Sequence, residues 1–197
     1  MAKDQDKVLK IYLFRHGETT FNRDKIFTGW LDPELTQKGI KQAELIAEKL
    51  KDKEFKVAYC SHLTRSKHTL NIVLKYHKDV EIIVDDRIIE RSYGDLQGRK
   101  HADYIKEVGK KQFDIIHRSY DVPPPNGESI KMVEKRVNEF IKDLLIKMKK
   151  EKISVAISAH GNSMRPFRRY FENLTIEEMI KLENPWDDYF EYDVPVE

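Results

Sequence analysis

Two kinds of hydrophobic pattern alternate along the first half of the chain. Val8–Phe14 is a short apolar, partly alternating run, and Val57–Tyr59 and Ile82–Val84 are further short runs of the strand type. Thr36–Lys51 has apolar residues at helical spacing behind a threonine suited to an N-cap, and a second helix is predicted from about Thr64 to Tyr76. Strands that alternate with helices in this way predict an α/β fold.

The second half of the chain resumes this alternation after an irregular stretch. A short helix is expected near Ala102–Val108, and the sequence PPPNG at 123–127 predicts a turn. Ile130–Met148 presents apolar residues on one helical face and leads into Ile153–Ala159, which is apolar enough for a central strand. Since the chain is long enough for one sizeable core and too short for two, we expect a single domain over residues 1–197.

Charge and composition narrow the classes of partner. Lysine and arginine total 36 against 34 acidic residues, so the net charge of +2 favours neither nucleic acid nor an anionic membrane as a partner. The longest apolar run, Ile153–Ala159, is far shorter than the roughly 20 residues of a membrane span, and Met1–Lys10 is polar rather than signal-like. The single cysteine, Cys60, cannot form an internal disulfide. We therefore expect a soluble, cytoplasmic protein.

Two predicted strands end in a His-Gly pair. Arg15, His16 and Gly17 follow the first strand, and His160 and Gly161 follow the strand at 153–159. In open α/β sheets ligands gather outside the carboxyl ends of strands, so both histidines are expected to face one pocket. A neutral imidazole can attack phosphorus while a neighbouring guanidinium holds the phosphoryl oxygens. This pattern indicates phosphoryl transfer with His16 as the nucleophile.

Six ordered motifs make the chain resemble the histidine phosphatase superfamily, and within it the cofactor-dependent phosphoglycerate mutases. They are RHGETTFN (15–22), FTGWLDPELTQKG (27–39), SHLTRSKHT (61–69), ERSYGDLQG (90–98), RSYDVPPPNGES (118–129) and AHGNSMR (159–165). The resemblance extends from Val8 to about Leu182. It implies an α/β three-layer sandwich, in which helices flank both faces of a mixed, mostly parallel six-stranded sheet.

The resemblance also implies roles for individual residues. His16 matches the phosphorylated residue, with Arg15, Arg65 and His160 forming the phosphate pocket, and Glu90 matches the residue that transfers protons. Two arginines and a histidine are suitable donors to a phosphoryl group in flight. Substrate-binding roles are implied for Asn22, Thr28, Gly29, Tyr93, His101, His117, Arg118, Gly161 and Asn162.

Cofactor and partner expectations follow from the same resemblance. A mutase of this family would use 2,3-bisphosphoglycerate as phosphoryl donor and would act on a small phosphorylated substrate. The seven histidines contain no HxH or HExxH pair and one cysteine makes no site, so we expect no metal. A homo-oligomer is compatible with the sequence, which leaves the oligomeric state open.

Several positions depart from the mutase pattern. His117 replaces the second of two adjacent arginines, and His101 falls where a lysine is expected, so we expect both to attract an anion only when protonated. The short Asn126–Glu128 replaces a longer insertion. The segment Asn184–Tyr189 is acidic and aromatic, and the chain has no clear basic tail to close the site.

Three hypotheses remain open at this point. The mutase is favoured by residues 27–30 and 118–125, whereas a phosphomonoesterase with the same His16 intermediate is favoured by His101, His117 and the short tail. The third, a non-catalytic binding protein, is the weakest, because none of the five residues expected to carry the chemistry has been lost.

Overall fold

The computed structural model describes residues 8–196, so most of the polar Met1–Lys10 segment lies outside the described residues. Its sheet comprises β1 (Leu9–Arg15), β2 (Val57–Cys60), β3 (Glu81–Val84), β4 (Val155–Ala159) and β5 (Tyr189–Val194), in the order β3-β2-β4-β1-β5. The first four strands run parallel, and β5 pairs antiparallel with β1. The expected α/β class with a mixed, mostly parallel sheet is confirmed.

The expected number of six strands is wrong, because the described residues form five. The long segment between β3 and α5 forms two short 3₁₀ turns, η2 (Asp86–Ile88) and η3 (Gly94–Leu96), and then enters a helix. This segment pairs with another only as an isolated bridge between Ile26 and Lys100, outside the sheet. A single bridge is too short to form a strand.

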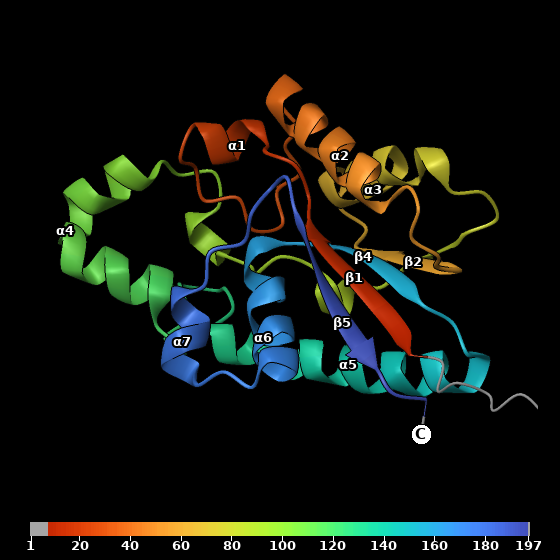
Figure 1. Cartoon of the computed structure of the whole chain (residues 1–197). Helices are drawn as coiled ribbons and strands as arrows, with labels where there is room; N and C mark the ends of the chain where they lie inside the picture. Colours follow the sequence, from red (N-terminus) through yellow and green to blue (C-terminus); the bar gives the residue numbers. More distant parts are fainter. Residues whose placement is uncertain (1–7, 197) are drawn as a thin grey trace, which may run out of the picture.

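Helices cover both faces of the sheet. They are α1 (Thr20–Arg23), α2 (Gln37–Leu50), α3 (Thr64–Val73, continued by the 3₁₀ turn η1, Leu74–Tyr76), α4 (His101–Arg118), α5 (Ile130–Glu151), α6 (Gly161–Glu172) and α7 (Ile176–Lys181). Figure 1 shows α2 and α3 on one side of the sheet and α5 and α6 on the other. Across residues 8–196, none of the helices has both the length and the apolar character needed to cross a membrane.

Alternation along β1 explains this three-layer arrangement. Leu9, Ile11 and Leu13 are buried in the core that contains the apolar side of α5. Tyr12 and Phe14 point to the other face and are buried with residues of α2 and α3. Because successive side chains of a strand point to opposite faces, one short apolar segment contributes to both cores.

The helices differ from the sequence predictions mainly at α4. The N-cap of α2 is as expected, with the Thr36 hydroxyl accepting from the Gly39 amide at 3.0 Å. However, α4 extends well beyond Ala102–Val108 and bends at Gly109, whose φ is 81°. This kink interrupts the helical periodicity and so conceals the second half of the helix. Figure 1 shows α4 beside the body of the sheet rather than packed across it.

Candidate active site

A cavity of about 260 Å³ opens beyond the carboxyl end of β1. Apart from His160, every residue that the sequence analysis placed in the site lines this cavity. These residues are Arg15, His16, Asn22, Thr28, Gly29, Arg65, Glu90, Tyr93, His101, His117, Arg118, Gly161 and Asn162. Segments from both halves of the chain therefore meet at the edge of the sheet where ligands gather in open α/β folds.

His16 follows the last residue of β1 and is held in one tautomer. Its Nδ1–H donates to the carbonyl oxygen of Gly17 at 2.8 Å, so the lone pair lies on Nε2. The side chain is buried, and burial lowers its pKa well below the usual value, with further lowering by the charges of Arg65 and Arg15. A neutral imidazole with a free Nε2 is the form that can act as a nucleophile.

Gly17 fixes the turn that carries this histidine. A Cβ on Gly17 would lie 2.2 Å from the backbone oxygen of Gly39, which no side chain can tolerate. The Gly17 amide also donates to the buried hydroxyl of Thr69 at 3.0 Å. The glycine therefore allows the start of α2 to pack directly against the loop and hold His16 in place.

His160 is at the equivalent end of the neighbouring strand. Arg15 of β1 and Ala159 of β4 are partners in the parallel ladder, and the His16 and His160 ring centroids are 5.0 Å apart. His160 Nε2 shares a hydrogen bond of 2.7 Å with the Ser61 hydroxyl, while its Nδ1 is buried without a partner. His160 is fully buried and does not line the cavity, and burial and the Arg65 charge lower its pKa.

Two arginines flank His16 and are held differently. Arg65, on α3, donates to the backbone oxygens of Leu31 and Gly29 at 2.7 Å each, and burial lowers its pKa to about 10. Arg15 makes a longer bond of 3.4 Å to the backbone oxygen of Asn184, and burial also lowers its pKa. The Nε of each arginine is buried without a partner. Both guanidinium groups therefore have donors available for an anion.

Glu90 is held at the cavity wall from several sides. Its Oε1 accepts from the backbone amides of Arg91 at 2.8 Å and Asn162 at 3.1 Å. Its backbone oxygen accepts from the indole N–H of Trp30 at 2.8 Å and from Arg136 at 3.0 Å. Glu90 as a residue is only 7% exposed, yet it lines the same cavity as His16, which suits its carboxylate to exchange protons with a bound ligand.

The ligand-capable atoms of His16, Glu90 and His160 all lie within 4.8 Å of one another. Three such atoms could in principle hold a metal ion. However, the charges of Arg15 and Arg65 act directly on His16 and would repel a divalent cation at the same point. The local electrostatics favour an anion.

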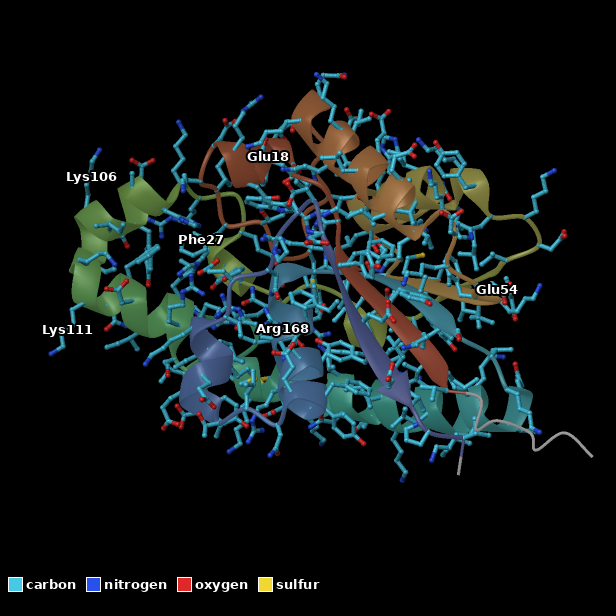
Figure 2. All side chains as sticks on the ribbon, in the orientation of Figure 1. Glu18, Phe27, Glu54, Lys106, Lys111 and Arg168 are labelled. Atoms are coloured by element: carbon cyan, nitrogen blue, oxygen red, sulfur yellow. The ribbon has the colours of Figure 1, made fainter. Side chains whose placement is uncertain are left out.

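His101 and His117 belong to an aromatic cluster at the far side of the cavity. The His101 ring lies 4.3 Å from Phe27, and the His117 ring stacks 5.1 Å from Phe113. Figure 2 shows Phe27 between α4 and the sheet. Burial lowers the pKa of His101 and lowers that of His117 to about 3. Burial thus favours the neutral form of both rings, as expected for positions that lack a permanent charge.

A second cationic group lies beside His117. Arg118 and Arg165 line the cavity together with His117, and the charges of both add to the lowering of its pKa by burial. Arg165 is buried, donates to the Ile180 carbonyl at 2.6 Å, and has its pKa lowered to about 10 by burial. Arg118 forms an ion pair of 3.2 Å with Glu183, whose side chain is 80% exposed. Four arginines therefore line the cavity, and the charges of Arg15 and Arg65 act on His16 whereas those of Arg118 and Arg165 act on His117.

Eight residues of the cavity wall were not among the predicted site residues, and four of them are Phe21 and Phe27, which belong to the motifs, and Lys25 and Ile26, which lie between the motifs. Arg165 ends the AHGNSMR motif and could have been found there, whereas Glu183, Asn184 and Trp186 carry no recognisable motif. Their position depends on the antiparallel pairing of β5 with β1, in which Tyr189 is the partner of Phe14.

Comparison with known proteins agrees with these observations. The sequence profile of the histidine phosphatase superfamily (branch 1) matches residues 11–188. A phosphoglycerate mutase of Schizosaccharomyces pombe is 41% identical over 179 residues, covering 88% of this chain and 84% of that protein. A 2,3-bisphosphoglycerate-dependent phosphoglycerate mutase of Parvibaculum lavamentivorans is 40% identical over 177 residues, covering 87% and 84%. Among solved structures, the α-ribazole phosphatase of Shigella flexneri shares the fold, with a TM-score of 0.82, 24% identity and coverage of 95% and 94%.

Proposed function

This chain belongs to branch 1 of the histidine phosphatase superfamily, and we propose that it is an enzyme of that superfamily interconverting 3-phosphoglycerate and 2-phosphoglycerate. The observation that carries the proposal is the pairing of cationic groups within one cavity. Arg15, Arg65, Arg118 and Arg165 line one cavity with His16 and His117; the first two charges lower the pKa of His16 and the last two that of His117. A phosphate beside His16 and a second anionic group near His117 match this charge distribution.

The donor set also suits 2,3-bisphosphoglycerate, on which the relative from P. lavamentivorans depends. Four arginines face the cavity against two carboxylates, those of Glu90 and Glu183, so a multiply charged anion is favoured. When bound, 2,3-bisphosphoglycerate would supply the phosphoryl group to His16. Arg15 and Arg65 would hold that phosphate, while Arg118 and Arg165 would hold the other anionic groups.

In the proposed reaction His16 Nε2 attacks phosphorus and forms an N–P bond as the bond from phosphorus to the donor oxygen breaks. Arg15 and Arg65 stabilise the charge on the equatorial oxygens during transfer. His160, which lies behind the cavity wall, packs beside His16 and is held by the hydrogen bond between its Nε2 and Ser61, while its Nδ1 has no partner. Transfer from the phosphohistidine to the free hydroxyl of a bound phosphoglycerate breaks the N–P bond, regenerates the bisphosphate and leaves His16 neutral.

Glu90 would donate and accept the proton that each half-reaction requires. In the first half-reaction its carboxyl gives a proton to the oxygen that leaves phosphorus. In the second, the carboxylate accepts a proton from the hydroxyl that attacks the phosphohistidine. The two backbone amides that bond Oε1 keep the carboxylate oriented in both states.

A phosphomonoesterase that uses the same phosphohistidine is the second candidate. One observation favours it: Glu183 neutralises Arg118 at 3.2 Å, and the neighbouring His101 and His117 are kept neutral by burial. Positive charge is thereby reduced where the second anionic group of a bisphosphate would bind. Water, which needs no such binding, would then compete more effectively for the phosphoryl group.

Product analysis separates the two candidates. The purified protein is incubated with 3-phosphoglycerate, with and without 2,3-bisphosphoglycerate, and 2-phosphoglycerate and free phosphate are measured together. A mutase gives 2-phosphoglycerate at a rate that the bisphosphate stimulates. Release of free phosphate with no isomerisation would assign the protein to the phosphatases.

A further inference from the structure

We infer that Trp186 is a positioning residue for Arg15, fixing its guanidinium group in the orientation that receives the phosphoryl group. The inference rests on the proposed transfer through His16 and adds a residue that lies outside the six motifs. The Arg15 guanidinium carbon lies 4.4 Å from the centroid of the Trp186 ring, and both residues line the cavity.

Arg15 needs such support because hydrogen bonds hold it only loosely. Arg65 is fixed by two bonds of 2.7 Å to backbone oxygens. Arg15, by contrast, has one bond of 3.4 Å, to the Asn184 oxygen, and its Nε has no partner. An arginine left this free would sample several rotamers, which a pre-organised site must prevent.

Packing supplies the restraint that hydrogen bonding does not. A Cβ added to Gly161 would come within 3.1 Å of Nη2 of Arg15, so the backbone at the start of α6 lies close against the guanidinium. The indole ring of Trp186 makes the other close contact. The Trp186 N–H is buried and makes no hydrogen bond. The contact of this side chain with Arg15 is therefore made by the face of its ring. A planar guanidinium is suited to stacking on an aromatic face.

The segment that carries the tryptophan is anchored to α6. The Asn184 side chain is buried, donates to the Gly161 carbonyl at 2.9 Å, and accepts from Arg168 at 3.1 Å. Pro185 then restricts the backbone directly before Trp186. On the other side, Tyr189 of β5 is the register partner of Phe14, the residue before Arg15. Both ends of the short segment are therefore fixed close to the arginine that its ring covers.

The first experiment compares turnover in three variants, with 3-phosphoglycerate as substrate and 2,3-bisphosphoglycerate present. We expect Trp186→Ala to lower kcat by about 10- to 30-fold, the range of a desolvated cation–π contact, with a smaller change in KM. Trp186→Phe, which keeps an aromatic face, should remain within about 3-fold of the wild type. Tyr170→Ala removes an exposed aromatic on α6 outside the cavity and serves as the control. Equal losses in the Ala and Phe variants, or no loss in either, would overturn the inference.

A binding experiment tests the contact without turnover. Trp30 and Trp186 are the two tryptophans, so Trp30→Phe leaves Trp186 as the only indole fluorophore. Binding of inorganic phosphate is measured by calorimetry, so that saturation is known. At saturation the fluorescence emission of Trp186 should change. In the same background Arg15→Lys keeps the charge but cannot stack as a plane, so the change should be lost at saturation.

The two experiments separate the inference from the proposed function. If the emission response depends on Arg15 as expected but no substrate is turned over, the proposed function fails and the contact stands. An emission response that is absent in the parent, or identical in the Arg15→Lys protein, refutes the positioning role even if the enzyme is a mutase. The binding experiment also decides the matter if Trp186→Ala does not fold.

Discussion

The imidazole rings of His16 and His160 lie 5.0 Å apart, each directly after a strand of the same parallel pair. Both rings are buried and near Arg65, and both have their pKa lowered well below the usual value. Two protonated imidazoles at this separation would repel one another and the arginines, so the neutral state of both is favoured. The paired strand ends thus favour an unprotonated His16 imidazole inside a cationic pocket, which is the form that the proposed nucleophile requires.

Replacing His16 by alanine should abolish activity, because among residues 8–196 no other histidine follows β1 with its Nε2 free for attack. We expect the rate to fall at least about 1000-fold, since that is the scale of catalysis which binding groups alone retain. The measurement is steady-state turnover combined with detection of acid-labile phosphate on the protein. His68→Ala, an exposed histidine on α3, is the matched control. A residual rate above a thousandth of wild type would contradict the phosphohistidine mechanism.

Removing the Ser61 hydroxyl should disturb His160. Ser61 Oγ is fully buried and 2.7 Å from His160 Nε2, so Ser61→Ala leaves both ring nitrogens of His160 without a partner. An unsatisfied buried polar group costs about 1–3 kcal/mol, and we expect a loss of that size in the free energy of unfolding. Because the His160 tautomer is no longer fixed, kcat should fall more than KM changes.

Chemical denaturation and kinetics on the same Ser61→Ala preparation test this expectation. Ser61→Thr, which keeps a hydroxyl, provides the comparison. A variant as stable and as active as the wild type would show that the hydrogen bond has no influence on His160.

Stability should depend on pH through the buried histidines. His117 has a pKa lowered from 6.5 to about 3 by burial, so the unfolded chain binds a proton more readily than the folded one. The contribution of His117 to the free energy of unfolding is therefore fully present above about pH 6.5 and is lost as pH falls towards about 3. Each such histidine contributes a slope of up to about 1.4 kcal/mol per pH unit in this window.

The test measures the free energy of unfolding at several values between pH 7 and pH 5 for the wild type and for His117→Phe. Phenylalanine suits the aromatic surroundings of Phe27 and Phe113 and cannot titrate. The variant should lose stability less steeply as pH falls. Parallel curves would mean that His117 is as easily protonated in the folded protein as in the unfolded chain.

The sequence was sufficient to predict the α/β class and the strands that place His16 and His160. It could do so because β1 and β4 are short apolar runs that end in the same dipeptide, so pattern and chemistry point to one edge of the sheet. The kink at Gly109 could not be predicted, because it changes the phase of the buried positions between Tyr104 and Phe113. The roles assigned to the site residues remain predictions.

No site role was predicted for the Glu183–Trp186 segment, although Asn184–Tyr189 stood out as acidic and aromatic. Its residues reach the cavity because β5 returns antiparallel to β1, a pairing of distant parts of the chain for which no strand had been predicted, and Val194 is the one buried residue of β5. The protonation state of His117 could not be predicted from the sequence either. Position alone suggested a titratable cation, whereas the Phe113 and Tyr93 rings that desolvate it come together only in the folded chain.

Glu183 is expected to weaken binding of substrates that carry a second anionic group. Its carboxylate is 3.2 Å from Arg118 and lines the cavity, so an anion that approaches Arg118 must displace or face it. Since the pair is exposed, its contribution is modest. We predict that Glu183→Gln lowers KM for 3-phosphoglycerate by about 2- to 5-fold and leaves kcat unchanged, the scale of an exposed ion pair.

Two comparisons test whether the effect of Glu183→Gln comes from its charge beside Arg118: a control variant that removes another charge, and a ligand that lacks the second anionic group. Glu177→Gln removes an equal charge from the exposed side of α7, outside the cavity, and should leave KM as it is. Inorganic phosphate lacks a second anionic group, so its inhibition constant should change less than KM for 3-phosphoglycerate. The difference should shrink as salt is raised, because screening acts strongly on exposed charges. Equal effects on both ligands would mean that Glu183 acts on the whole cavity, and that Arg118 does not bind the distal group of the substrate.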